Sequence, residues 1–218
     1  MNIAVIIPSY NSNSSLDELI DLINRENNLS IIVIDDGSKD PFRSTLENVE
    51  VLRNRQNRGK GFSLRKAFKH AEEQSFTHAV TLDADLQHNP KEIHLFIGAS
   101  NKIDFVLGYR ERDHSMPIHR KLSNIITTYI ISSLTGNNIL DSQCGFRRYN
   151  LKTVNSSSYK EDGFQFESEV LIRCVERNTS IEQIKIETIY DSNNKSYIKH
   201  VSDTLKFIRL ILRSLIKQ

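Results

Sequence analysis

The chain has 218 residues, of which 38% are hydrophobic and 26% are charged, a composition typical of a globular protein with a substantial apolar core. Its formal net charge of +2 argues against nucleic-acid binding, because a protein that binds the phosphate backbone needs a strongly basic face. The two cysteines, Cys144 and Cys174, are too few for a disulfide scaffold or a closed zinc site, so we expect reduced thiols in a cytoplasmic protein.

Strands and helices alternate through the first half of the chain. Apolar runs predict strands at residues 2–8, 29–38, 49–54, 78–85 and 104–109. Helical patterns lie between them at 14–23 and 61–74, and a further helix is predicted to start at Pro90. Ser15 and Glu18 fit a capping box at the start of the first helix. This alternation predicts an α/β fold with a Rossmann-like, mostly parallel central sheet flanked by helices.

The second half of the chain is less regular and mainly helical. Helices are predicted at 122–136, which Gly136 ends, and at 164–177, and a strand is predicted at 181–190. We expect one domain at 1–198, followed by an amphipathic basic helix at 199–218. The apolar face of this helix consists of Val201, Leu205, Ile208, Leu212 and Leu215. The basic residues on the opposite side are Lys206, Arg209, Arg213 and Lys217.

The C-terminal helix has two interpretations. It either packs its apolar face within the domain, or lies in a membrane interface with its basic face toward the headgroups. No segment has the roughly 20 consecutive apolar residues of a membrane span, and the N-terminus lacks the basic region of a signal peptide. We therefore expect a cytoplasmic protein, with this helix as the part that would attach it peripherally to the cytoplasmic face of a membrane.

Polar segments follow four of the predicted strands. They are "PSYN" (8–11), "DDGSKD" (35–40), "DADLQ" (83–87) and "GYRERD" (108–113). The carboxyl ends of parallel strands meet at one edge of a sheet, where open α/β sheets bind their ligands. The sequence therefore predicts a binding site at this edge.

The acids of "DADLQ" indicate a metal site. Asp83 and Asp85 repel each other when packed closely, and a hard cation such as Mg²⁺ or Mn²⁺ removes that repulsion. Gln87 would add a third oxygen ligand. The alternative is that Asp83 caps the turn while Asp85 is simply solvated. The glycine-rich "NRGKG" (57–61) likewise is either a phosphate-binding loop or a turn into the next helix.

Taken together, these segments resemble the family-two glycosyltransferases, which have the GT-A fold. The resemblance runs through "VIIPSYN", "VIDDGSKD", "NRGKGFSLRKAF", "TLDADLQHNP", "LGYRERD", "DSQCGFRRYN" and "FQFESEVLIR". Within that family, "LDADLQHNP" and the D-x-x-C-G-F-R pattern are most similar to the dolichyl-phosphate mannosyltransferase and polyprenyl-phosphate glycosyltransferase branch.

The resemblance implies roles for individual residues. It implies that a nucleotide-sugar is held by Pro8, Tyr10, Asn11, Asp36, Lys60, Asp83, Ala84, Asp85 and Arg112. It implies that the metal is bound by Asp83, Asp85 and Gln87, and that Arg147 faces the phosphates of the donor or of the acceptor. A hydroxyl acceptor needs a general base, for which Asp141 is the candidate by position. With a lipid phosphate acceptor, Asp141 would instead orient Arg147.

The expected activity is transfer of a sugar from a UDP- or GDP-sugar to a polyprenyl or dolichyl phosphate by a metal-dependent inverting glycosyltransferase. One alternative is transfer to the hydroxyl of a cell-surface glycan. Further alternatives are a sugar-nucleotide pyrophosphorylase and an inactive nucleotide-binding protein. The expected partners are the nucleotide-sugar and a lipid phosphate at a membrane surface. A second copy of the chain or a membrane protein is a further possible partner, which would contact the C-terminal helix.

Overall fold

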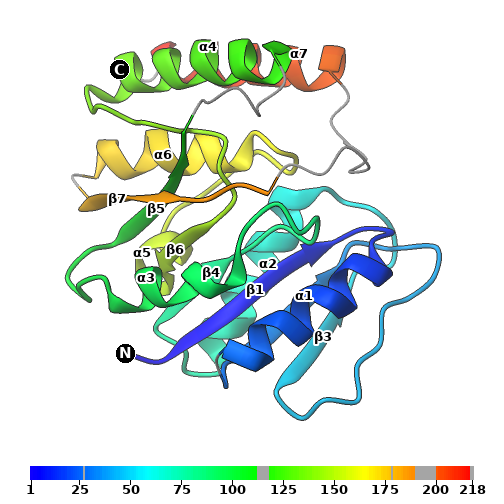
Figure 1. The fold of residues 1–218 in the computed structure, drawn as a ribbon. Helices are drawn as coiled ribbons and strands as arrows, with labels where there is room; N and C mark the ends of the chain where they lie inside the picture. Colours follow the sequence, from blue (N-terminus) through cyan, green and yellow to red (C-terminus); the bar gives the residue numbers. More distant parts are fainter. Residues whose placement is uncertain (27, 112–117, 178, 190–199, 217–218) are drawn as a thin grey trace.

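The computed structural model describes residues 1–26, 28–111, 118–177, 179–189 and 200–216. Among these residues the centre is a seven-stranded sheet in the order β3-β2-β1-β4-β6-β5-β7 (Figure 1). The strands are β1 (Ile3–Ser9), β2 (Ser30–Asp35), β3 (Val49–Arg53), β4 (His78–Thr81), β5 (Phe105–Arg110), β6 (Arg147–Asn150) and β7 (Ile181–Ile186).

The sheet is mostly parallel, as the alternating pattern predicts. Strand β1 pairs in parallel with β2 and β4, β2 with β3, and β5 with β7. Strand β6 is the exception, because it lies antiparallel between β4 and β5. No apolar run predicts β6, whose four residues include Arg147 and Arg148.

Helices cover both faces of the sheet. They are α1 (Asn13–Glu26), α2 (Lys60–Glu73), the 3₁₀ helix η1 (Pro90–Glu92), α3 (Ile93–Gly98), α4 (Ile118–Thr135), α5 (Leu151–Asn155), α6 (Phe166–Glu176) and α7 (His200–Ile216). The predicted capping box at Ser15 is wrong, because α1 begins two residues earlier, at Asn13. The Ser15 hydroxyl instead donates to the carbonyl of Ser12, which also accepts from the Leu16 N–H at 3.0 Å.

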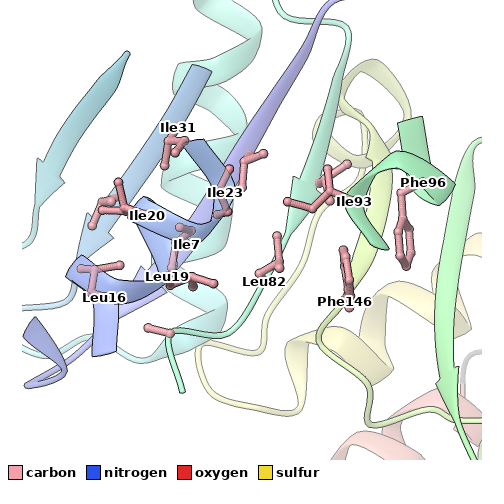
Figure 2. Close-up of a cluster of buried hydrophobic side chains, with 14 of the residues drawn as sticks. Ile7, Leu16, Leu19, Ile20, Ile23, Ile31, Leu82, Ile93, Phe96 and Phe146 are labelled. Atoms are coloured by element: carbon pink, nitrogen blue, oxygen red, sulfur yellow. The ribbon is translucent and has the colours of Figure 1, made fainter. Parts of the chain in front are cut away.

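Alternation along the strands divides the core into two layers. Val5 and Ile7 of β1 pack with the buried stripe of α1 and with α3 on one face of the sheet (Figure 2). Ala4 and Ile6 point to the other face, where they pack with α2, α5 and α6. Because β1 and β2 are buried on both faces, their sequences are continuous apolar runs.

Arg148 joins β6 to the end of α3. Its side chain is completely buried, and its guanidinium donates to the carbonyls of Phe96, Ala99, Ser100 and Ile103 at 2.6–3.1 Å. These carbonyls lie at the C-terminal end of α3 and just beyond it, where helix carbonyls lack partners within the helix. The arginine therefore satisfies several buried acceptors at once.

Helices α4, α6 and α7 form a third packed unit at one end of the molecule (Figure 1). Ile131 of α4, Leu171 of α6 and Leu210 of α7 belong to one buried cluster, which also contains Leu107 of β5. Helix α7 is also tied to the loop between α5 and α6 by an ion pair of 2.6 Å between Arg213 and Glu161. Among the helices described, none is both long and apolar enough to cross a membrane.

Candidate active site at the carboxyl edge of the sheet

The strand order reverses between β1 and β4. From β1 the chain moves outward to β2 and β3, whereas β4 begins the other half of the sheet. The loops after β1 and β4 therefore diverge, and a crevice at such a point is where open α/β sheets bind ligands. Residues 10–11 follow β1 and residues 82–87 follow β4, so two of the predicted polar segments border this crevice.

The loop after β1 is fastened to the loop after β2. The backbone N–H of Asn11 donates to the Ser38 hydroxyl at 2.8 Å, and the Asn11 amide oxygen accepts from the Lys39 N–H at 2.9 Å. Asn11 has a positive φ of 52°, which asparagine tolerates better than most residues. Pro8 and Tyr10, beside it, are half-buried.

Asp36 contacts the glycine-rich loop. Its carboxylate accepts from the backbone N–H groups of Arg58 at 2.9 Å and Gly59 at 2.8 Å, and from the side chain of Asn54 at 2.8 Å. Asp36 is 4% exposed. The resemblance implies a nucleotide contact for Asp36, whereas in the structure its carboxylate fixes the loop that precedes Lys60.

Lys60 is the first residue of α2 and lies between two carboxylates. Its ammonium is 2.6 Å from Asp83 and 3.1 Å from Glu167, which lies in the first turn of α6. Burial would lower the pKa of Lys60 and raise that of Asp83. The opposite charges outweigh burial, so the pKa of Lys60 is raised and that of Asp83 is held well below its usual range.

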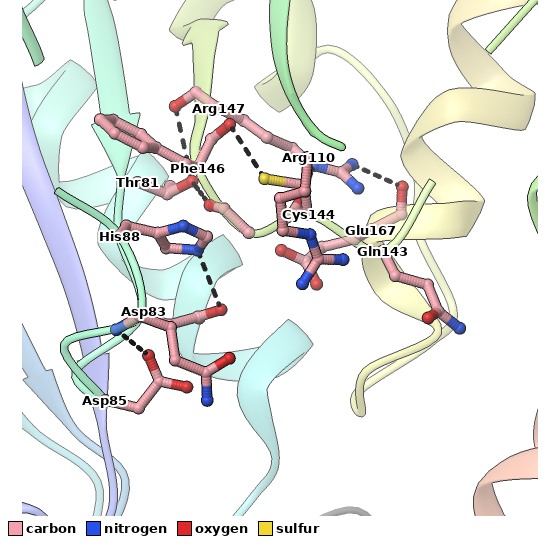
Figure 3. Close-up of polar contacts among 12 residues, drawn as sticks. Thr81, Asp83, Asp85, His88, Arg110, Gln143, Cys144, Phe146, Arg147 and Glu167 are labelled. Atoms are coloured by element: carbon pink, nitrogen blue, oxygen red, sulfur yellow. Dashed lines mark hydrogen bonds and ion pairs between the residues drawn. The ribbon is translucent and has the colours of Figure 1, made fainter. Parts of the chain in front are cut away.

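Asp85 differs electrostatically from Asp83. Its carboxylate accepts from the Gln87 backbone N–H at 3.1 Å (Figure 3). The pKa of Asp85 is raised, first because the group is buried and second because the charge of Asp83 is close. Ala84, between the two acids, is buried, and Leu86, directly after Asp85, has a positive φ of 60°.

His88 and Gly145 lie beside Asp83. Figure 3 shows the His88 ring directed at the Asp83 carboxylate. The Nε2 atom of His88 lies 3.9 Å from the Asp83 carboxylate, and its ring packs against Phe146 with 5.5 Å between ring centroids. Gly145 lies so close that a Cβ there would overlap the Asp83 carboxylate. A side chain at position 145 would therefore displace the Asp83 carboxylate.

Asp141 forms a buried ion pair with Arg110 at the end of β5. The Asp141 carboxylate accepts from Arg110 Nε at 2.7 Å and from the Asn124 side chain of α4 at 2.6 Å. Asp141 is 2% exposed, and although burial alone would raise its pKa, Arg110 holds the pKa below its usual range. The arginine that Asp141 orients is thus Arg110, and not Arg147 as expected.

Arg147 is placed differently from the expectation that it faces phosphates. Its side chain is 1% exposed. Its guanidinium donates to the main-chain carbonyls of Cys144 at 2.7 Å, Ser142 at 2.8 Å and Glu167 at 3.0 Å (Figure 3). Arg147 therefore ties the segment before β6 to α6, behind the polar groups of the site.

The carboxylates at the crevice could bind a divalent cation whose remaining coordination positions are filled by oxygen atoms of a bound ligand and by water. Among the described residues no group of three or more His, Cys, Asp or Glu side chains could hold a metal alone. Asp83 and Asp85 nevertheless offer two close carboxylates, and the pKa of Asp85 is raised first by burial and second by the charge of Asp83. Mg²⁺ is commonly bound by one or two carboxylates together with phosphate oxygens and water.

Two residues at the crevice, Glu167 and His88, receive no role from the sequence. Both lie within segments that carry the resemblance, in "FQFESEV" and directly after "DADLQ". The signal for Glu167 is an acid in the first turn of a helix, but only the fold brings that turn to Lys60. The predicted site residue Arg112 lies outside the described part of the chain.

A doubly wound sheet with paired carboxylates at its switch point defines an α/β protein of the GT-A type. The chain belongs to glycosyl transferase family 2, whose model matches residues 4–162. The fold, the family and the expectation of a glycosyltransferase are thereby confirmed, and the pyrophosphorylase alternative is not supported.

Several relatives come from one branch of that family. The chain is 27% identical to a UDP-N-acetylglucosamine–dolichyl-phosphate N-acetylglucosaminyltransferase of Methanococcus voltae, over 96% of this chain and 95% of the relative. It is 28% identical to a dolichol-phosphate mannosyltransferase of Pyrococcus furiosus, over 95% of this chain and 64% of the relative. It is 26% identical to an undecaprenyl-phosphate 4-deoxy-4-formamido-L-arabinose transferase of Proteus mirabilis, over 92% of this chain and 64% of the relative.

Solved structures share the fold. Glucosyl-3-phosphoglycerate synthase from Mycobacterium tuberculosis, in complex with Mn²⁺, UDP and glucosyl-3-phosphoglycerate, matches with a TM-score of 0.73 at 19% identity, over 98% of this chain and 79% of that one. The same enzyme with Mn²⁺, UDP-glucose and phosphoglyceric acid gives a TM-score of 0.77 at 18% identity, with the same coverage. At such identities the likeness shows the fold alone.

Proposed function

We propose that this protein transfers a sugar from a nucleotide diphosphate to a polyprenyl phosphate, with inversion at the anomeric carbon and with bound Mg²⁺ or Mn²⁺. The observation that carries the proposal is the pair of carboxylates, Asp83 and Asp85, at the switch point of the sheet. The relatives support the acceptor class, because their names specify dolichyl or undecaprenyl phosphate. The Mn²⁺ and UDP of the structural neighbour support the donor class and the metal.

The diphosphate would bind at the paired acids. The cation, when bound, would neutralise the negative charge that grows on the leaving diphosphate. Asp83 and Asp85 would hold it, with Gln87 as a further oxygen ligand. Lys60, whose ammonium is 2.6 Å from Asp83, adds a positive charge beside the same phosphates. The buried acid Glu167 keeps that lysine charged and in place.

The nucleotide would lie against the loops after β1 and β2. Pro8, Tyr10 and Asn11 are the proposed contacts from the first loop, with Ala84 and Arg112 completing the set. Asp36 would act by holding the loop before Lys60, since its carboxylate already accepts two backbone N–H groups there. A direct contact between Asp36 and the nucleotide remains a prediction.

The contacts of Asp141 favour an anionic acceptor over a hydroxyl. A glycan hydroxyl would need a general base to remove its proton. Asp141, the candidate base, is buried and engaged by Arg110 and Asn124, and its pKa is lowered. A lipid phosphate is already an anion and needs no base, but it needs a cation to offset its repulsion with the donor phosphates. Arg110, which Asp141 holds at the end of β5, is the arginine that would face this phosphate.

Calorimetry with UDP and with GDP, in the presence and absence of Mn²⁺, tests the proposal. We expect one nucleotide to bind more tightly with the metal. Asp85→Asn should weaken metal-dependent binding at least about tenfold, because even losing a group that only supports a metal ligand costs about 10–100-fold in affinity. Asp21→Asn, on the exposed side of α1, is the matched control and should bind as the wild type does.

The acceptor is tested separately with a radiolabelled nucleotide-sugar. We expect label to enter undecaprenyl phosphate and not a soluble glycan. Label in the glycan alone would favour the hydroxyl alternative. A wild-type protein that binds neither nucleotide in the presence of Mn²⁺ would contradict the proposed function altogether.

A further inference from the structure

Helix α4 turns polar side chains inward and apolar side chains outward. Its buried residues include Asn124, Thr128 and Thr135, each at most 5% exposed. Asn124 donates to Asp141 at 2.6 Å, and Thr128 lies 3.1 Å from the Ser142 hydroxyl, so these polar groups are satisfied within the protein. The exposed residues of the same helix are mainly large and apolar: Ile118, Leu122, Ile125, Ile126 and Tyr129.

Helix α7, beside α4, also carries large apolar residues on its outer side, although its inner side is apolar as well. Leu210 is 2% exposed and packs into the cluster that also contains Ile131 of α4. The stripe predicted as the apolar face of α7 points the other way: Leu205 is 62% exposed and Leu212 is 57% exposed. Figure 1 shows the two helices along one end of the molecule. We call this surface the α4–α7 face, and its main residues are Leu122, Ile126, Tyr129, Leu205, Leu212 and Leu215.

Basic residues outnumber acidic ones on the two helices of the α4–α7 face. The sequence of α4 contains no Asp or Glu, and that of α7 contains only Asp203. Lys206 and Arg209 of α7 are exposed; Lys206 lies 3.6 Å from Asp203, and Arg213 is paired with Glu161. Two copies of such a face would bring like charges together, which disfavours pairing with a second copy. An apolar stripe edged by Lys and Arg matches the interface of a membrane with anionic lipids.

We propose that the α4–α7 face docks on an anionic phospholipid bilayer, with its leucine, isoleucine and tyrosine side chains inserted at the level of the headgroups. The inference deepens the proposed function and rests on it for its purpose, because a polyprenyl phosphate acceptor resides in such a bilayer. The inner side of α4 touches Asp141, which holds Arg110. Only the thickness of α4 therefore separates the bilayer from the arginine expected to meet the acceptor phosphate.

Vesicle flotation of the full chain tests this proposal without any acceptor or donor. We expect the protein to float with vesicles of phosphatidylcholine and phosphatidylglycerol, and to float less with phosphatidylcholine alone. Ile126→Asn and Leu212→Asn should each reduce partitioning about tenfold, since each removes an apolar group from the bilayer interface. Leu46→Asn is the matched control, because Leu46 is 43% exposed but lies away from α4 and α7. It should float as the wild type does.

The outcomes separate this inference from the proposed function. Nucleotide binding by the same variants should match the wild type, because none of the substituted residues lies at the crevice. A wild type that binds nucleotide with Mn²⁺ but no vesicles would overturn the membrane inference alone. A wild type that floats but binds no nucleotide would overturn the proposed function and leave the inference standing. A dimer that both face variants dissociate, together with no flotation, would assign the face to a second copy and overturn the inference.

Discussion

Gly145 lies against the carboxylate of Asp83, and this carboxylate leaves no space for a methyl group at that position. The atoms that a Cβ would meet belong to the end of a flexible side chain, so the aspartate would move before the backbone does. The geometry of one proposed metal ligand thus depends on a residue far from it in the sequence. A substitution at Gly145 should therefore change metal binding through Asp83 without changing the stability of the fold.

Gly145→Ala should therefore weaken Mn²⁺-dependent nucleotide binding at least about tenfold, as loss of a group that positions a metal ligand does. Its melting temperature should change little. Gly98→Ala is the matched control, because no atom lies within 4 Å of a Cβ at that position. Calorimetry and thermal unfolding on both variants measure the two effects. Full metal-dependent affinity in Gly145→Ala would show that Asp83 need not hold its present position.

Asp141 makes the stability of the protein depend on pH. Its pKa in the folded protein lies below the ordinary value of 3.8. At pH values between these two pKa values, the unfolded chain binds a proton at Asp141 that the folded chain does not. The stabilisation by the Arg110 pair is present above that ordinary value and is lost as the pH falls through the folded pKa. Asp141→Asn should cost about 1–3 kcal/mol at neutral pH.

Urea unfolding between neutral pH and pH 3 checks this prediction. The difference in unfolding free energy between wild type and Asp141→Asn should narrow as the pH falls below about 4. Asp17→Asn, on the exposed side of α1, should leave the profile unchanged. A constant difference across the whole range would mean that the charge of Asp141 does not provide the stabilisation.

At the scale of the elements, β6 determines how the second half of the sheet is built. It lies between β4 and β5, and each of its two arginines connects it to another segment. Arg147 donates to carbonyls before β6 and at α6, while Arg148 donates to carbonyls at and beyond the end of α3. Buried arginines of this kind are acceptable because nearly all their donors find acceptors.

Replacing Arg148 with methionine should destabilise the fold by about 3 kcal/mol or more, because several buried carbonyls would lose their partner. Arg55→Met, at an exposed position in the loop after β3, should change stability by less than about 0.5 kcal/mol. Chemical denaturation measures both values. A small effect for Arg148→Met would indicate that water replaces the guanidinium at the end of α3.

At the scale of the whole molecule, the cluster of α4, α6 and α7 determines whether the C-terminal helix folds with the sheet. Leu210 is buried in that cluster, whereas Leu212, two residues later, is 57% exposed. Leu210 therefore reports on the packing of α7 against the domain, and Leu212 reports on the outward face of the same helix. Replacing each leucine with alanine removes the same group of atoms at a buried and at an exposed position.

Leu210→Ala should lower the unfolding free energy by about 2–5 kcal/mol, as for other buried leucines. The unfolding transition should stay single, because α7 and the sheet share one core. Leu212→Ala should change stability by less than about 0.5 kcal/mol. Two separate transitions in the wild type would instead support a C-terminal helix that folds independently of the domain.

The strands and the position of the acids could be predicted from local patterns, while the arginines could not. Continuous apolar runs identify β1 and β2, and Asp83 and Asp85 follow such a run directly. Strand β6 has no such pattern, because its arginines are buried against carbonyls that the fold brings around them, and several of these carbonyls are distant in the sequence. The burial of Arg147 and the Asp141–Arg110 pair are likewise products of tertiary packing. The same holds for α7, whose amphipathic pattern does not tell which face is covered.

The antiparallel direction of β6 has a consequence for how such proteins diversify. Because β5 and β6 run in opposite directions, the chain between Arg110 and Arg147 leaves the sheet and returns to it at the same edge. A segment with both ends at one place can change length or sequence without shifting the pairing of either strand. This one carries α4 and Asp141. The α4 and Asp141 positions, which we propose for membrane docking and for the acceptor side, could therefore vary together without a change in the strands that carry the proposed donor site.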